Sequence, residues 1–279
     1  MRKLLSSSLF RLWKSKAFWV LEAGVTAWGI FCSVLVILNT YRLGEAWLVD
    51  SANTYFYVQL LYLAAVLAIF SVLFIGTEYE HGTIRNKLSV GHSRKSIYLS
   101  NLIVAAFVGG IFAVSHVLTA FVAVPFVGMK AITGVSLQGW RFLCWGLIIL
   151  VYSALFTLLA MVDSNKARNV LVSLLLALLL MFGGAFVHGK LAEPESADLW
   201  LENEQGYLVL QENARNSDYL TGAVRVVFDW LDVILPSSQG IRITNREGLF
   251  DVRMPVCSVV LTGSLTALGI TLFKKKNSK

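Results

Sequence analysis

Residues that commonly carry catalysis or bind metals are few in this chain and lie far apart. Of the four histidines, only His116 falls within a strongly apolar stretch, and no carboxylate accompanies it in that stretch or the next. The three cysteines form no CxxC pair, which disfavours a zinc site or a redox motif. The HExxH and GxSxG patterns of metallohydrolases and serine hydrolases do not occur. We therefore expect no catalytic or metal site, and we expect His116 to be hydrogen bonded within a helix bundle.

A nucleotide-binding loop is also missing. Such a loop has the pattern G-x-x-x-x-G-K-[ST], whose backbone cradles phosphates. The chain contains a single Gly-Lys pair, Gly189–Lys190, and it continues to Leu191. The chain therefore cannot bind and hydrolyse ATP by that mechanism.

The most informative polar segment is GTEYEHGTIRNKLSVGHSRKSIYLSN, residues 76–101. Gly82 can interrupt the preceding helix, and Thr83 and Ser93 can each cap a following one. The pattern predicts a short helix over residues 84–88, held between two longer helices. This helix would present three polar side chains outward, namely Arg85, Asn86 and Lys87.

The composition indicates the elements that must hold this segment. Only 15% of the residues are charged and 56% are apolar, and the mean hydropathy is +0.67, which excludes an ordinary soluble domain and a disordered chain. A helix needs about 20 apolar residues to cross a bilayer. The sequence predicts an all-α integral membrane protein with six transmembrane helices, over residues 18–38, 57–75, 99–124, 142–162, 170–187 and 256–273.

The distribution of charge predicts the orientation of these spans. With the amino terminus in the cytoplasm, the inner segments hold 15 of the 24 Lys and Arg residues, and the outer segments hold 13 of the 17 acids. Positive residues favour the cytoplasmic side, so both termini are expected there. The basic clusters border span ends, where anionic lipids attract them, and this disfavours nucleic acid as a partner.

Two segments outside the spans have amphipathic patterns. Residues 1–17 place Leu5, Leu9, Leu12 and Trp13 on one face, which predicts a helix lying in the membrane interface rather than a cleaved signal peptide. Within the outer loop, residues 188–255, a second helix is predicted over 219–235 and is stopped by Pro236. Its apolar stripe consists of Leu220, Val224, Val227, Leu231 and Ile234. We expect this stripe to rest on the span mouths, with the bilayer surface or a partner as alternatives.

Two polar residues inside the predicted spans leave alternatives open. Glu22 could pair with Lys16 or reach the interface, or it could face an inner vestibule and contact a cationic cargo. Gln59 could join two helices by hydrogen bonding or line a cavity along a translocation path.

The polar loop closely resembles the loop of ABC-2 type permeases, the membrane subunits of bacterial ATP-driven exporters. In that family E-x-E-x-GTIRNKL-x-x-G-x-(S/T)-R forms a coupling helix that docks on the ATPase subunit. The matching residues are Glu78, Glu80, Gly82, Thr83, Ile84, Arg85, Asn86, Lys87, Leu88, Gly91 and Arg94. The six-span layout is similar as well, and LPSSQ at 235–239 is similar to an element before the family's last span.

The resemblance implies a single permease domain, 1–279, with an interfacial helix (1–17), a coupling loop (76–98) and an extracellular loop (188–255). It further implies two copies of an ABC ATPase that bind ATP and Mg, no cofactor in this chain, and a second permease that is identical or paralogous. The expected function is export of an amphipathic or hydrophobic cargo, such as a peptide, lipid or drug, across the cell membrane. In the family, helices of the outer loop form an extracellular gate; a lid that only stabilises the bundle is the alternative. An ion-coupled secondary transporter and a non-transporting sensor or anchor remain as alternative functions.

Overall fold

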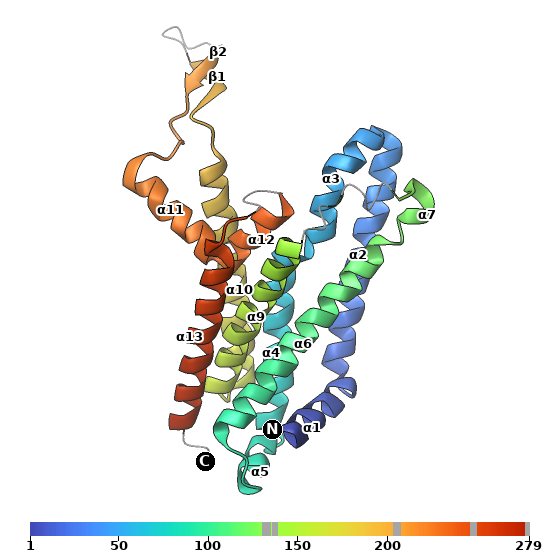
Figure 1. Cartoon of the computed structure of the whole chain (residues 1–279), viewed down its shortest axis with the longest axis vertical. Coiled ribbons are helices and arrows are strands. Elements are labelled where there is room, and N and C mark those ends of the chain that lie inside the picture. The colour runs from blue at the N-terminus through green and yellow to red at the C-terminus, as the bar shows by residue number, and fades with distance from the viewer. Residues whose placement is uncertain (130–134, 136–138, 203–207, 246–249, 277–279) are drawn as a thin grey trace.

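The protein is a bundle of long helices (Figure 1). The computed structural model describes residues 1–129, 135, 139–202, 208–245 and 250–276. Within these residues, six segments are long and apolar enough to cross a membrane: Lys16–Leu43, Ser51–Glu80, Arg94–Val127, Gly139–Val162, Lys166–Ala192 and Arg253–Lys275. The six predicted spans are therefore confirmed.

Most of these segments coincide with single helices. They are α2 (Lys16–Leu43), α4 (Gln59–Glu80), α6 (Arg94–Ala120), α9 (Gly139–Val162), α10 (Lys166–Ala192) and α13 (Arg253–Lys275). The second segment begins earlier than predicted, because α3 (Glu45–Tyr57) is separated from α4 only by Val58, whose backbone is itself helical. A short helix, α7 (Val124–Val127), follows α6.

The shorter elements lie at the two ends of the bundle (Figure 1). One end, called the α5 end below, holds α1 (Arg2–Trp13), α5 (Thr83–Ser89) and the last turn of α13. The opposite end, called the hairpin end, holds α11 (Gly222–Ile234), α12 (Pro236–Thr244) and a projecting hairpin of β1 (Ser196–Glu202) and β2 (Leu208–Arg215). The chain thus starts and finishes at the same end, as an even number of spans requires.

The core lies around α4 and α9, which pack against each other and are mostly buried. Leu67, Ile148, Tyr152 and Phe156 are fully buried there. By contrast, α10 and α13 are largely exposed, and α10 presents a continuous apolar face: Leu171, Leu175, Leu178, Leu179, Phe182 and Phe186. In a membrane protein such a face contacts lipid or another subunit.

Close approach of helices is possible where small residues meet. At Gly29 of α2, an added Cβ would lie 3.0 Å from Cβ of Thr119 in α6, and Ser33 Oγ donates to the Thr119 carbonyl at 2.7 Å. At Gly184 of α10, an added Cβ would lie 2.8 Å from the backbone nitrogen of Ser238 in α12. Small residues at such crossings let backbones approach closely in membranes.

Two expectations about the elements need correction. The hairpin was not predicted, because its residues carry many acidic and polar side chains without the alternation of a half-buried strand. The strands pair antiparallel from Ser196↔Arg215 to Glu202↔Leu208. The second amphipathic helix begins at Gly222, so Leu220 lies before it, and Pro236 both follows α11 and starts α12. Positions 203–207 and 246–249 of the outer loop lie outside the described residues.

The loop 76–98 and its contacts

The short helix α5 is held between two glycines whose backbones are left-handed. Gly82 has φ 63° and Gly91 has φ 89°, values that L-residues with a Cβ rarely adopt. Ser93 caps α6 as predicted, because its Oγ accepts a hydrogen bond from the backbone nitrogen of Ser96 at 3.2 Å. Thr83 is not a cap: it is the first residue of α5, Gly82 holds the cap position, and no side chain caps this helix end.

Glu78, at the end of α4, is the centre of an ionic cluster that joins four helices. Its side chain is fully buried. Arg11 Nη1 of α1 lies 2.8 Å from Oε1, and Lys87 Nζ of α5 contacts the same oxygen. Asn101 Nδ2 of α6 donates to Oε2 at 3.0 Å. A movement of α5 is therefore connected directly to α1, α4 and α6.

Two cations share this single carboxylate, so the cluster keeps a positive charge. The guanidinium of Arg11 also stacks on the Phe74 ring, with 3.8 Å between Cζ and the ring centroid. Burial lowers the pKa of Arg11 from its ordinary value, and the nearby Glu78 charge opposes this shift. The Glu78 carboxylate therefore offsets part of the cost of burying the charged form of Arg11.

The side chains of α5 divide differently from the prediction. Ile84 is buried and Leu88 is half-buried against the bundle, while Arg85 and Asn86 are exposed. Lys87 does not point outward, since its side chain is only 12% exposed and is directed to Glu78. The physical reason is that a fully buried carboxylate needs cationic partners. The exposed surface of α5 is therefore made by Arg85, Asn86 and Ser89.

Other residues of the loop connect to the ends of distant helices. Glu80 forms an ion pair with Lys166 at the start of α10, with 2.9 Å between Oε2 and Nζ. Arg94 Nη1 donates to the carbonyls of Phe273 and Lys276, at 2.8 and 2.5 Å, and so caps the carboxyl end of α13. Cations at helix carboxyl ends are stabilising. Of the predicted loop residues, Glu78 and Lys87 therefore meet in the buried cluster, whereas Glu80 and Arg94 contact α10 and α13 instead.

Sequence reasoning did not identify Arg11 and Asn101 as members of this cluster. Arg11 lies outside the apolar stripe predicted for residues 1–17, and Asn101 falls within the third predicted span, 99–124. The sequence carries one indication of this cluster. Glu78 follows the apolar Phe74 by four residues, so the two side chains share one face of the helix. A carboxylate on a buried helix face predicts that cations or amide donors come from neighbouring elements.

The face of α1 that is buried against the bundle differs from the apolar stripe predicted for residues 1–17. Leu4, Ser8 and Leu12 are buried against the bundle, and Ser8 Oγ lies 3.2 Å from Ser100 Oγ of α6. Trp13, which was assigned to the apolar face, is 49% exposed. Tertiary packing against α6 selects a face rotated from the one that hydrophobic spacing alone predicts.

The two candidate path residues are both used in contacts between helices. Gln59 Nε2 donates to the Ala113 carbonyl of α6 at 3.4 Å, so it joins two helices. Glu22 accepts a hydrogen bond from Ser115 Oγ of α6 rather than pairing with Lys16. Ser115 belongs to the last turns of α6, so Glu22 lies beside that end of the helix.

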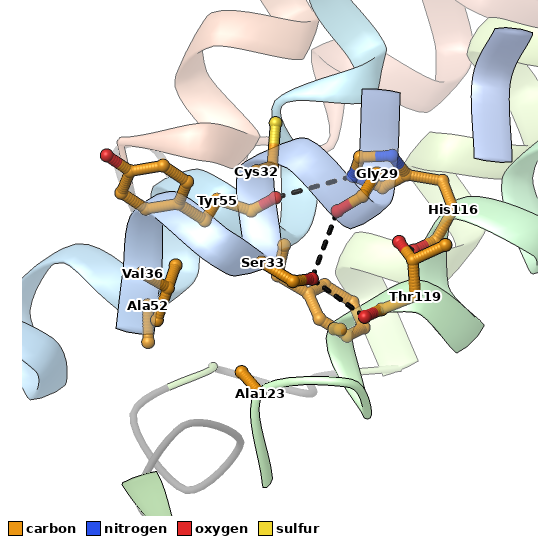
Figure 2. Close-up of a pocket in the computed structure, with 11 residues that line it drawn as sticks. Gly29, Cys32, Ser33, Val36, Ala52, Tyr55, His116, Thr119 and Ala123 are labelled. Atoms are coloured by element: carbon orange, nitrogen blue, oxygen red, sulfur yellow. Dashed lines mark hydrogen bonds between the residues drawn. The ribbon is translucent and has the colours of Figure 1, made fainter. Parts of the chain in front are cut away.

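His116 lies in a small cavity between α2, α3 and α6 (Figure 2). Its Nδ1 lies 3.0 Å from the Tyr62 hydroxyl and its Nε2 lies 3.4 Å from the Tyr55 carbonyl, so both ring nitrogens have partners. This confirms the expected bundle histidine. The cavity measures about 30 Å³, enough for a water molecule or two and too small for a cargo.

At the hairpin end, the apolar stripe of α11 does not rest on the span mouths. Val224 and Val227 are 53% and 56% exposed, and Leu231 and Ile234 are also exposed. The expectation of packing within this chain is wrong, because α11 instead buries the opposite face, where Val233 is covered completely. The stripe is left for lipid or another subunit.

The covered face of α11 contains a polar cluster. Asp232 Oδ1 lies 3.3 Å from His188 Nδ1 and accepts a hydrogen bond from Ser238 Oγ, and Arg242 lies 3.5 Å from Oδ2. Burial by itself would raise the pKa of Asp232, but the hydrogen bonds from His188 and Ser238, with the Arg242 charge, lower it. The cluster therefore ties α10, α11 and α12 together at this end.

These features define a helical, multi-pass membrane protein with a small helix mounted between two spans at one end. Residues 5–184 match the ABC-2 family transporter proteins, which is more than half of the chain. The chain belongs to this family, and its loop resemblance is thereby confirmed. No curated protein matches the chain. The match ends within α10, so the hairpin, α11, α12 and α13 lie beyond it.

Proposed function

We propose that this chain is the membrane-spanning permease of an ATP-driven exporter, in which α5 receives the movement of a separate ATPase subunit. The observation that carries the proposal is the Glu78 cluster. It connects α5 to three other helices through charged contacts in a fully buried position. A loop that only connected two spans would not need charged groups buried beneath it, because burying a charge costs free energy.

The cluster suggests how force would travel. A displacement of α5 moves Lys87, which carries Glu78 and hence the end of α4 with it. Arg11 then transmits the displacement to α1, and Asn101 transmits it to α6. Because the helices are close-packed, they shift as rigid elements rather than deforming locally. The spans would tilt and open an apolar path for an amphipathic or hydrophobic cargo.

The remaining parts of the proposal concern the assembly. Two ATPase subunits would supply ATP and Mg, since this chain has no phosphate-binding loop of its own. A second permease would cover exposed apolar faces such as that of α10. The α5 end would lie in the cytoplasm of a cell membrane, because the Lys and Arg residues concentrate there. Hydrogen bonding of both ring nitrogens of His116 favours this reading over an ion-coupled carrier.

Docking on α5 is tested with Arg85→Ala/Asn86→Ala in the purified permease–ATPase complex. Both side chains are exposed, so thermal stability of the permease is expected to stay unchanged. Affinity for the ATPase is expected to fall about 10-fold or more, because arginines at interfaces are frequent hot spots. Lys95→Ala/Lys274→Ala, also exposed and at the same end, is the matched control. Full ATPase binding and ATP-driven transport in the Arg85/Asn86 variant would refute the proposal.

We also propose that the exposed stripe of α11 contacts the second permease and gates the outer end of the path. Cysteine at Val227 in both protomers would form a crosslink if the stripes face each other. An outer gate predicts that the crosslink stops export while ATP binding continues. Unchanged export in the crosslinked complex would show that α11 only stabilises the bundle.

A further inference from the structure

A pocket of about 360 Å³ lies at the α5 end, where α1 turns into α2 and meets α4 and α10. Its volume falls in the range of roughly 300–1,000 Å³ that is usual for ligand pockets. Four cations line it, and no carboxylate is among its lining residues: Arg11, Lys14, Lys16 and Lys166. The chain thus builds a concentrated positive site beside the coupling loop, and of its four cations the exporter mechanism above uses only Arg11.

The positive charge of this pocket is only partly compensated. Arg11 shares Glu78 with Lys87, and Lys166 is paired with Glu80. Within the described residues, Nε and Nη2 of Arg11 have no hydrogen-bond acceptor although they are shielded from solvent. An additional anion in the adjoining pocket would offset this charge.

The first turn of α2 adds to the positive electrostatic potential of the pocket. Ser15 caps this 28-residue helix by accepting from the backbone nitrogen of Phe18, and Ser15, Lys16 and Ala17 all line the pocket. The amino end of a helix carries a partial positive charge and binds anions, phosphate groups above all. The helix end and the lysines therefore favour the same class of ligand, a group that bears a phosphate.

The rest of the pocket indicates the source of that phosphate. Its floor is apolar and includes Leu73 and Phe74 of α4. Beside it, Trp13 and Trp19 are half exposed and in contact, and Trp19 Nε1 donates to the Trp13 carbonyl at 2.9 Å. Exposed tryptophans of a membrane protein concentrate at the headgroup level of the bilayer. A soluble phosphate would need neither the apolar floor nor this position.

We infer that the pocket at the α1–α2 turn binds the phosphate headgroup of an anionic phospholipid. The lysines contact the phosphate, the start of α2 donates to it, and the glycerol and upper acyl carbons lie over Leu73. The bound lipid would stabilise the turn that places Arg11 against Glu78. The inference depends on the membrane character of the chain and not on ATPase coupling.

The test measures lipid binding to the purified full-length chain by native mass spectrometry, with phosphatidylglycerol or phosphatidylcholine added. Phosphatidylglycerol is expected to bind at least about 10-fold more tightly, because only it carries a net negative headgroup. In Lys14→Gln/Lys16→Gln, this affinity is expected to fall about 30-fold, from roughly fivefold for each lysine near an anionic lipid. Both lysines are exposed, and an unchanged melting temperature would verify the fold of the variant.

The matched control is Lys95→Gln/Lys274→Gln, which removes two exposed cations from the same end without touching the pocket. It is expected to change phosphatidylglycerol affinity less than about threefold, because a charge beyond a Debye length is screened. Equal losses in the two variants would indicate diffuse attraction and overturn the inference. Equal binding of the two lipids, or displacement of phosphatidylglycerol by inorganic phosphate, would also overturn it. None of these readouts requires an ATPase, so the result is independent of the proposed function.

Discussion

Neutralising Glu78 tests the ionic cluster at the base of α5 most directly. In Glu78→Gln the shape of the side chain is retained, but Arg11 and Lys87 are left facing each other without a carboxylate. Breaking a buried ion pair by removing one partner costs about 3–5 kcal/mol. Because the side chains of Arg11 and Lys87 are 28% and 12% exposed, both can recover some hydration, which lowers the expected cost to roughly 2–3 kcal/mol.

This cost should appear as a large change in thermal stability. For chains of this size, about 1 kcal/mol shifts the melting temperature by roughly 2–4 °C, so Glu78→Gln is expected to lower it by about 5–10 °C. Lys87→Met should lower it much less, because Glu78 then keeps Arg11 as a partner in a one-to-one pair. The assay is thermal unfolding of the purified permease in detergent, followed by tryptophan fluorescence.

The combination of the two changes separates the cluster from a simple loss of packing. In Glu78→Gln/Lys87→Met, one of the two uncompensated cations is gone, so the loss should be smaller than the sum of the single losses by about 1 kcal/mol or more. Additive losses, or a Glu78→Gln protein that melts within about 1 °C of the unchanged chain, would refute the idea that two cations share this carboxylate.

Two further predictions concern the hairpin end. Gly184→Ala is expected to destabilise the protein by about 1–3 kcal/mol, since the new Cβ would lie 2.8 Å from the backbone nitrogen of Ser238; Gly183→Ala, with open space around it, is the control and should leave the melting temperature unchanged. Hydrogen bonding to Arg253 lowers the pKa of Asp251, so ionised Asp251 stabilises the fold above its ordinary pKa of about 4 and loses this effect as the pH falls through the lowered value. Asp251→Asn should therefore lower the melting temperature at pH 7, and its difference from the unchanged chain should shrink as the pH falls below about 4. A difference that stays constant from pH 7 to pH 3 would contradict this assignment.

The spans and the short helix of the loop 76–98 could be predicted from local features of the sequence. A membrane helix must be long and apolar, because its backbone polar groups can be satisfied only within the helix, and this leaves a signal in any window of about 20 residues. The break at Gly82 and the cap at Ser93 could be predicted for a similar reason. Each depends on the backbone conformation or the short side chain of one residue.

The structure alone decided which groups meet. Lys87 was expected to face outward because the short helix looked polar on most of its surface, yet the buried carboxylate of Glu78 draws it inward. The stripe of α11 was expected to be covered, yet the same helix buries Asp232 and Val233 and leaves Val227 exposed. A hydrophobic stripe shows that a helix has an apolar face, but lipid, a second subunit and the chain's own core can all cover such a face.

The sequence by itself determined the number of apolar helices that could span a membrane, the position of the loop 76–98 and the family to which the chain belongs. These properties depend on residues that are close together in the sequence, through the hydrophobicity of a segment or the backbone preference of a single residue. Only the tertiary structure decided that Arg11, Glu78, Lys87 and Asn101 form one cluster, because they come from four helices and up to 90 positions separate them in the chain. The physical reason is that a buried charge selects its partners by distance in space, and that distance is set by how the helices pack.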